Sequence, residues 1–171
     1  MLLLSALFAM SLFVSPVTAS VDNAAKSPSD KDRCAVCGMF VAKYPQWISL
    51  VELEDKTTVW FDGVKDMMAY SFGPEAFGAA TGVAIKKMRV KDYYSQEWID
   101  GRQAFYVAGS DVTGPMGHEL IPFSSEKPAS SFMKDHHGKK LLPFADIDSE
   151  RIESMRKGHK MKMMRMEKKE K

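Results

Sequence analysis

The sequence predicts an α+β fold in which two related strand-strand-helix units form small antiparallel sheets that helices pack against. Two observations predict it. The order of strand, strand, helix cap and helix occurs twice, roughly 60 residues apart, with Phe61 before Asp62 in one unit and Phe123 before Ser124 in the other. The chain of 171 residues, 45% hydrophobic and 27% charged, is also long enough for one domain with an apolar core.

The amino-terminal segment has the features of an export signal. Residues 2–17 carry no charge, and Val17-Thr18-Ala19 followed by Ser20 fits a signal-peptidase site. The apolar run is shorter than the roughly 20 residues that span a bilayer, so a short anchor or a buried helix is the alternative. We therefore expect a signal peptide over residues 1–19, a flexible polar leader over residues 20–33 and a periplasmic location. An exported chain is not expected to bind nucleic acid.

The first unit follows the leader. Residues 47–53 have the composition of a strand, residues 54–56 of a tight turn and residues 57–61 of the returning strand. Asp62-Gly63 is a helix N-cap signal, and apolar residues then recur at helical spacing through residues 64–72.

The second unit repeats this order over a longer stretch. The predicted elements are strands at residues 84–94 and 104–110, a loop at 111–117, a strand at 118–123, a helix from Ser124 to near Gly138 and a strand at 140–144. We predict one domain over residues 34–148, made of two half-repeats over about 34–82 and 83–148.

The carboxyl-terminal segment, residues 149–171, differs in composition from the domain. From residue 151 onward it holds nine Lys or Arg against three Glu, together with five of the thirteen methionines and His159. Such a tail solubilises a protein or contacts an acidic surface, including a membrane surface. Met161, Met164 and Lys168 do not form a clean apolar stripe, so we do not expect it to dock on the core. Capture of Cu(I) by its thioethers is the alternative.

The only two cysteines of the chain lie in Cys34-Ala35-Val36-Cys37-Gly38-Met39. Two thiolates and a thioether this close are soft ligands, which favour Cu(I) over harder cations. A local disulfide or a redox pair, with Met39 as core filling, is the alternative. Because Cys37 is followed by glycine and the chain lacks further cysteines, covalent c-type haem attachment and a four-thiolate zinc site are excluded.

A second group of candidate ligands lies in Pro115-Met116-Gly117-His118. A methionine between proline and glycine is poorly placed for core packing, because its neighbours shape a turn. Met116 is therefore a better ligand candidate than a helical methionine, and His118 is a candidate further donor. A solvated loop histidine is the alternative for His118.

These residues together carry a family resemblance. The Cys-Ala-Val-Cys-Gly-Met stretch, the strand-turn-strand leading to Phe61-Asp62-Gly63 and the later Pro-Met-Gly sequence closely resemble the NosL family, the accessory proteins of nitrous-oxide reductase. The resemblance covers about residues 34–147. It implies an exported Cu(I) chaperone that delivers copper to a membrane ABC-type complex for maturation of nitrous-oxide reductase.

By motif match, the resemblance implies Cys34, Cys37, Met39 and Met116 as candidate copper ligands. We hypothesise that Cys37, Met39 and Met116 converge on one shallow site. Two features depart from the family pattern: the predicted cleavage site lacks the lipid-bearing cysteine of many members, and the Met-rich basic tail is additional. The recipient could therefore be another copper protein.

The rival interpretation from another class is a thiol-disulfide oxidoreductase. Its first cysteine would lie at a helix N-terminus after an apolar strand. Here charged residues 30–33 precede Cys34, and Gly38 with Tyr44-Pro45 disfavours a following helix. A structural disulfide in a binding module would leave Met39 and Met116 unexplained. The sequence shows no set of catalytic residues that we recognise, so we predict a protein that is not an enzyme.

Overall fold

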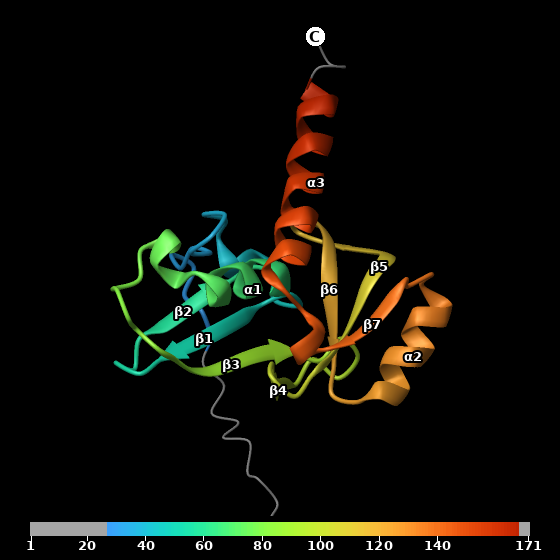
Figure 1. Ribbon diagram of the computed structural model, residues 1–171, viewed down its shortest axis with the longest axis horizontal. Coiled ribbons are helices and arrows are strands. Elements are labelled where there is room, and N and C mark those ends of the chain that lie inside the picture. Colours follow the sequence, from blue (N-terminus) through green and yellow to red (C-terminus); the bar gives the residue numbers. More distant parts are fainter. Residues whose placement is uncertain (1–26, 168–171) are drawn as a thin grey trace, which may run out of the picture.

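The computed structural model describes residues 27–167, with side chains described as far as Gly158. This part contains seven strands and three α-helices (Figure 1). The strands are β1 (Ser49–Leu53), β2 (Thr58–Phe61), β3 (Ile85–Lys91), β4 (Trp98–Asp100), β5 (Phe105–Gly114), β6 (Gly117–Phe123) and β7 (Lys140–Pro143). The helices are α1 (Val64–Phe72), α2 (Glu126–Asp135) and α3 (Ser149–Glu167). The predicted α+β class with small antiparallel sheets is confirmed.

The first sheet has the strand order β2-β1-β3-β4, and each neighbouring pair is antiparallel. β1 and β2 form the predicted hairpin, with Leu50 opposite Trp60. β3 pairs with β1, and β4 lies between the strands predicted at residues 84–94 and 104–110, where no strand was predicted. β3 and β4 belong to the same sheet as the first hairpin. The chain therefore passes to the second sheet after β4, whereas the predicted half-repeats divide near residue 83. The division into half-repeats stays a prediction.

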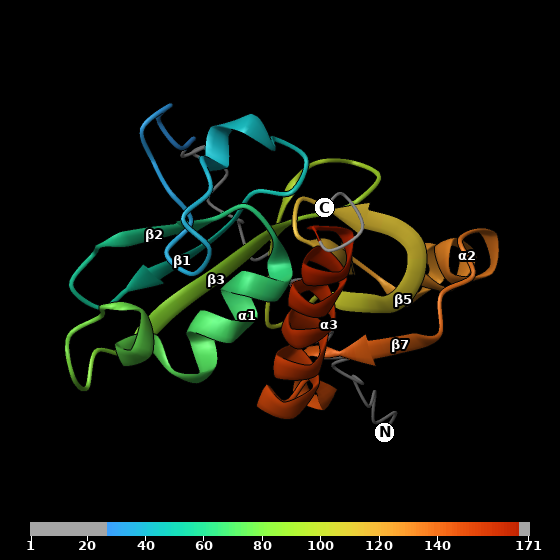
Figure 2. The same cartoon turned by 90° about the horizontal axis from the view of Figure 1, so that it is seen from above.

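The second sheet has the order β6-β5-β7. The predicted loop at residues 111–117 is wrong, because β5 continues to Gly114 and β6 starts at Gly117. Only Pro115 and Met116 form the turn, with Gly114 paired to Gly117 across it. A register shift after Ala108, next to Gly109 with its φ of +79°, bends β5 strongly and lets the hairpin extend (Figure 2).

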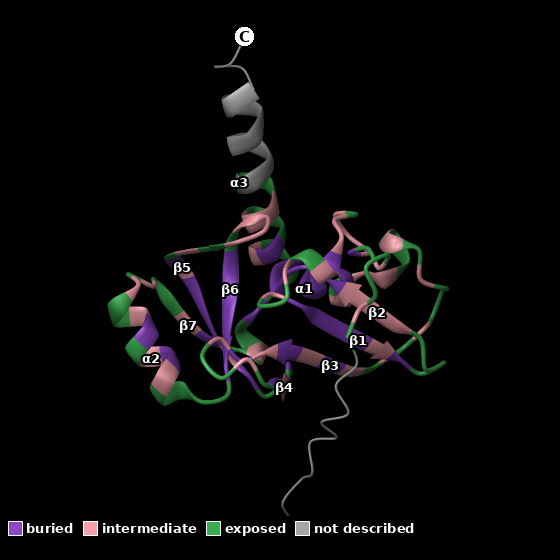
Figure 3. Cartoon of the chain, turned by 180° about the vertical axis from the view of Figure 1, so that it is seen from behind, coloured by how far each residue is buried: buried purple, intermediate pink, exposed green. Residues whose placement is uncertain are grey.

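The helices occupy different positions. We call the part built on the first sheet the first half of the molecule and the part built on the second sheet the second half. α1 lies beside α3 and contacts β6, so it is enclosed between the two halves (Figure 2). α2 packs on the second sheet through Ala129 and Phe132, and its outer face is open (Figure 3). Almost all of α1 is buried, whereas most of α2 is not.

The prediction that the tail does not dock is wrong for its first turns. Ile152 is 1% exposed and belongs to the main core, and Met155 packs against that core. These two residues lie three positions apart on one face of α3, ahead of the positions on which the prediction depended. Further along, α3 extends away from the body of the domain (Figure 1).

The structure describes only part of the amino-terminal region for which we made predictions. The predicted signal peptide and residues 20–26 lie outside the described residues. The end of the predicted leader belongs to the fold, because Arg33 forms a β-bridge with Phe40 and the Asp32 carbonyl accepts a hydrogen bond from the Val41 N–H at 3.0 Å. Within the described residues, no helix is both long and apolar enough to cross a membrane.

Candidate metal centre

A closed loop presents the two cysteines. The Gly38 N–H donates to the Cys34 carbonyl at 2.9 Å, and the Cys34 N–H donates to the Met39 carbonyl at 2.8 Å. Gly38 has a φ of +79°, which glycine adopts without the steric cost of a side chain. The Arg33 guanidinium donates to the Gly38 carbonyl at 2.8 Å and thereby fixes the loop from outside. Both cysteines are free thiols.

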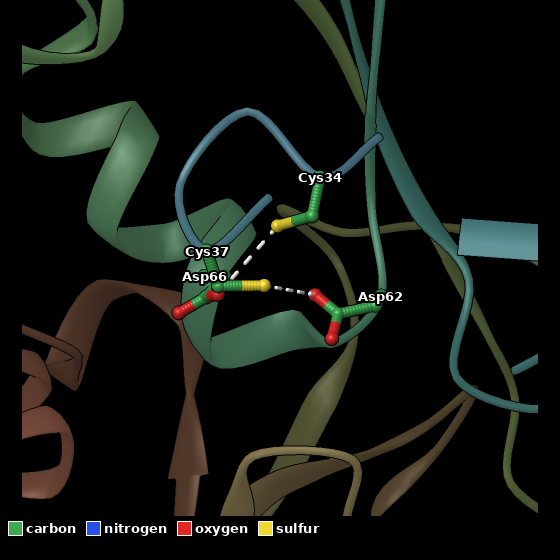
Figure 4. A group of neighbouring side chains, drawn as sticks. All are labelled: Cys34, Cys37, Asp62 and Asp66. Atoms are coloured by element: carbon green, nitrogen blue, oxygen red, sulfur yellow. Dashed lines mark hydrogen bonds between the residues drawn. The ribbon is translucent and has the colours of Figure 1, made fainter. Parts of the chain in front are cut away.

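Two aspartates face these thiols. Asp62 follows β2, and Asp66 lies in the first turn of α1. The Cys37 thiol donates to Asp62 Oδ1 at 3.1 Å, and the Cys34 thiol donates to Asp66 Oδ2 at 3.6 Å (Figure 4). The four potential ligand atoms, two sulfurs and two carboxylate oxygens, all lie within 4.8 Å of one another. We call these four residues the thiol-carboxylate cluster.

The cluster is mostly withdrawn from solvent. Cys34 is 2% exposed, Asp62 1% and Asp66 4%, while Cys37 is only partly buried. The hydrogen bond with Cys34 is the largest influence that raises the pKa of the Cys37 thiol well above its ordinary value, and burial adds to it. Burial, followed by repulsion from Asp62, raises the pKa of the Asp66 carboxyl. The cluster thus disfavours the charged forms of Cys37 and Asp66.

A bound cation would relieve this crowding. Within the described part of the chain, Asp62 Oδ2 is buried and has no hydrogen-bond partner. Buried carboxylate oxygens are normally paired, so an unpaired one beside two thiols is an acceptor that a bound cation would satisfy. Thiols and carboxyl groups lose their protons when they bind a metal ion, and the ion takes the place of those protons. The residues present therefore fit a metal ion.

The second half of the molecule is joined to this centre by Lys65. Its buried Nζ donates to the carbonyl oxygens of Met116 at 2.7 Å and His118 at 2.8 Å. Its backbone N–H donates to Glu119 Oε1 at 2.6 Å. These bonds hold the β5–β6 hairpin against the first turn of α1, which also bears Asp66. Glu119 is fully buried, and burial raises its pKa to about 7 against the opposing effect of the Lys65 charge.

The predicted ligands are placed in two groups. Cys34 and Cys37 come together, and Met39 closes their loop through its carbonyl. Met116 forms the hairpin tip that Lys65 holds, whereas His118 is exposed and lines a cavity between the hairpin and α3. The convergence of Cys37, Met39 and Met116 on one ion stays a prediction.

Sequence reasoning missed the two carboxylates. Asp62 was interpreted as part of a helix cap, but the N-cap residue is Gly63. The Asp62 carboxylate instead accepts a hydrogen bond from the Cys37 thiol. A signal was present: Lys65 and Asp66 lie in an otherwise apolar helix, where charged side chains are expected to have buried partners. The approach of the cysteine loop to that helix is a contact between distant segments, which local patterns do not contain.

The comparison with known families now decides the relationship. The NosL sequence model matches residues 25–152, most of the chain. The chain belongs to the NosL family. This agrees with the cysteine loop and the Pro-Met-Gly turn that predicted it.

Two relatives are similar over the same region. The copper-binding lipoprotein NosL of Stutzerimonas stutzeri is 28% identical over 127 residues, which are 70% of this chain and 63% of the relative. The protein of the same name from Achromobacter cycloclastes is 31% identical over 118 residues, 65% of this chain and 61% of the relative. The matched region is thus less than two thirds of the length of either relative.

A solved structure shares the fold. The crystal structure of the copper chaperone NosL from Shewanella denitrificans superposes with a TM-score of 0.62 at 24% identity, covering 73% of this chain and 96% of that one. At this identity the comparison establishes the arrangement of helices and sheets.

Proposed function

We propose that this chain is an exported Cu(I) carrier whose cargo binds at the thiol-carboxylate cluster. The observation that supports it is the gathering of two free thiols and two buried carboxylates within 4.8 Å, next to the hairpin that bears Met116. Cys34 and Cys37 would supply thiolate ligands, and Met39 and Met116 are the thioether candidates. His118 stays a weaker candidate because its side chain is exposed.

The donor chemistry favours Cu(I). Thiolates and thioethers are soft ligands that select Cu(I), and two or three of them suffice for it. Two cysteines with two aspartates would also suit Zn²⁺, which accepts sulfur and carboxylate oxygen in a tetrahedral site. Met39 in the cysteine loop and Met116 on the hairpin held by Lys65 add thioethers to the donor candidates, which favours the soft ion. Zinc is therefore the competitor that a test has to include.

The different burial of the two sulfur atoms suits both the binding and the release of copper. Cys34 is buried, whereas Cys37 is partly open to solvent. A recipient thiolate or thioether can therefore approach the ion from the Cys37 side before the Cys34 bond is lost. The neighbouring carboxylates can accept the thiol protons that copper displaces, and they return them when copper leaves.

A carrier fits the thiols better than a redox catalyst does. An attacking cysteine needs a lowered pKa, often at a helix N-terminus. Here residues 35–37 form a turn, and the Cys37 thiol has a raised pKa beside Cys34 and Asp62. Cys34, burial and Asp62 thus work against formation of the Cys37 thiolate in the empty protein, and a bound cation would offset this effect.

The names of two relatives support an exported location for this chain. The two curated relatives are named copper-binding lipoproteins, which supports export and membrane association for this chain. We propose a periplasmic location and delivery of copper to a membrane ABC-type complex and to nitrous-oxide reductase. Another copper protein is the alternative recipient. The basic tail would favour contact with an anionic membrane surface.

The test is an anaerobic Cu(I) titration of the reduced protein against a competing chelator. The proposal predicts tight binding near one copper per chain, loss of that binding in a Cys34→Ser/Cys37→Ser variant, and no displacement by excess Zn²⁺. A Ser110→Ala variant, altered at a buried position of β5, is the control and should bind as the parent does. Equal binding by the cysteine variant, or displacement by Zn²⁺, would contradict the proposal.

A further inference from the structure

Arg156 of α3 reaches the thiol-carboxylate cluster with its charged side chain. Its Nε lies 3.9 Å from Asp66 Oδ1, and 28% of the arginine side chain is exposed against 5% of the aspartate side chain. α3 lies beside α1, which bears Asp66, and docks on the core through Ile152 and Met155 (Figure 2). A positive charge is therefore held at the edge of the candidate metal centre.

Two further contacts hold the guanidinium of Arg156 in this place. Its Nη1 donates to Glu153 Oε1 at 2.8 Å, about one turn earlier on the same helix. Its central carbon lies 5.5 Å from the centre of the Phe77 ring, within the range of a cation–π interaction. An arginine side chain also stays charged at every pH at which a protein is folded. Both the position and the charge of Arg156 are therefore well defined.

Asp66 lies between this charge and the thiols. Its Oδ2 accepts the hydrogen bond from the Cys34 thiol at 3.6 Å, whereas its Oδ1 is the atom that pairs with Arg156. Burial raises the pKa of the Asp66 carboxyl, and the charges of Lys65 and Arg156 oppose that effect. The same carboxylate is thus a potential metal ligand on one side and the partner of a cation on the other.

The two candidate ions make different demands on Asp66. Zn²⁺ takes four ligands in a tetrahedral site, and the cluster itself offers four only when both aspartates bind the ion. Cu(I) is satisfied by two or three sulfur ligands and does not need the Asp66 carboxylate. The repulsion between the Arg156 charge and a bound ion is also twice as large for a divalent ion as for a monovalent one. Arg156 therefore disfavours Zn²⁺ more than Cu(I) for two separate reasons.

We propose that Arg156 determines the metal specificity of the thiol-carboxylate cluster: it pairs with Asp66, withholds that carboxylate from a divalent ion and so favours Cu(I) over Zn²⁺. This inference rests on the proposed function, because it takes the cluster as the place where the cargo binds. Arg156 acts through Asp66 and is a positioning residue. Loss of its charge therefore changes the ratio of the two metal affinities, whereas damage to the packing of α3 would weaken the binding of both ions.

The test measures the Cu(I) and Zn²⁺ affinities of the reduced full chain, each by anaerobic competition with a chelator. Arg156→Gln should tighten Zn²⁺ binding about tenfold or more and Cu(I) binding by no more than about threefold, because the repulsion of a monovalent ion is half as large. Arg156→Lys keeps the positive charge and should keep the ratio of affinities of the parent. The matched control is Lys157→Gln, which removes the same charge from an exposed neighbour on α3 and should change neither affinity.

A further pair of variants tests whether the effect runs through Asp66. Asp66→Asn removes the carboxylate that Arg156 is proposed to withhold. In this background, Arg156→Gln should tighten Zn²⁺ binding by no more than about threefold, because only the direct repulsion between the arginine and the ion is left to remove. An equally large gain in both backgrounds would show that Arg156 does not act through Asp66.

Three results of the main comparison would overturn the proposal. They are an unchanged Zn²⁺ affinity in Arg156→Gln, equal changes for the two ions, and the same gain in Zn²⁺ affinity from Lys157→Gln, which would assign the effect to the overall charge of α3. A parent chain that does not bind Cu(I) tightly contradicts the proposed function instead. In that case the Zn²⁺ affinities still decide whether Arg156 withholds Asp66 from a divalent ion.

Discussion

The two strand-strand-helix units have the same order of elements but bury different residues in their helices. α1 buries a continuous run from Val64 to Tyr70 that includes Lys65 and Asp66. α2 buries only Ala129 and Phe132, which face the second sheet (Figure 3). The cause is position: α1 is enclosed by its own sheet, β6 and α3, whereas α2 lies at the outside.

This difference shows where the chemistry of the fold can lie. A charged side chain is rarely buried without a partner, so an enclosed helix with Lys65 and Asp66 has to have partners for both. The cysteine loop and α3 provide them for Asp66, and the hairpin tip provides them for Lys65. The first half therefore holds the candidate site, and the second half covers and braces it.

The largest effect on stability is expected from a substitution in the core of the second half. Phe132 is fully buried in the smaller core beside Phe123. Phe132→Ala should lower the free energy of unfolding by about 3–5 kcal/mol, because it removes a buried ring and leaves a cavity. Chelator competition on the protein that remains folded should give the parent Cu(I) affinity. A large loss of affinity would show that the second core also shapes the metal centre.

The next largest effect is a pH dependence of stability that comes from Glu119, where the two halves meet. The pKa of Glu119 is raised from 4.5 to about 7 in the folded protein, so the folded state keeps a proton that the unfolded state has lost. This contribution is fully present below about pH 4.5 and is lost as the pH rises to about 7, a change of roughly 3 kcal/mol at most. Glu119→Gln should remove this slope.

Urea unfolding of both proteins at pH 5 and pH 7.5 measures this effect, with the empty protein kept reduced. The difference between parent and variant isolates Glu119 from the other titrating groups. Parallel pH profiles would mean that Lys65 keeps the carboxylate ionised throughout.

A smaller effect is expected from steric crowding at the same place. A methyl group on Gly63 would collide with Glu119 Oε2. Gly63→Ala should therefore cost about 1–3 kcal/mol of stability. A double-mutant cycle with Glu119→Ala measures the coupling, and the Gly63→Ala cost should shrink once the carboxylate is gone. An unchanged cost would show that the two halves are not in contact there.

The smallest effect concerns affinity. If Met116 supplies a thioether from the second half, Met116→Leu should weaken Cu(I) binding about tenfold, near 1.4 kcal/mol. Met133→Leu is the matched control, because Met133 packs beside the smaller core. Competition titrations compare the two variants. Equal affinities would leave the hairpin only a covering role.

The sequence was sufficient for features that depend on local patterns. The first hairpin, α1, α2 and the cysteine loop follow from strand alternation, helical spacing and turn residues. Three features depend on contacts between distant segments, and these were missed. They are the approach of Asp62 and Asp66 to the thiols, the tight turn at Pro115 and Met116, and the docking of Ile152. The bend of β5 decided the second of these, and the enclosed position of α1 decided the other two.

The most direct measurement is copper-edge X-ray absorption of the protein loaded with one Cu(I). If copper binds at the thiol-carboxylate cluster, we expect a reduced copper ion with sulfur neighbours from Cys34 and Cys37, and loss of that sulfur signal in the Cys34→Ser/Cys37→Ser variant. A shell dominated by oxygen or nitrogen, and unchanged in the variant, would contradict the placement of copper at the thiol-carboxylate cluster.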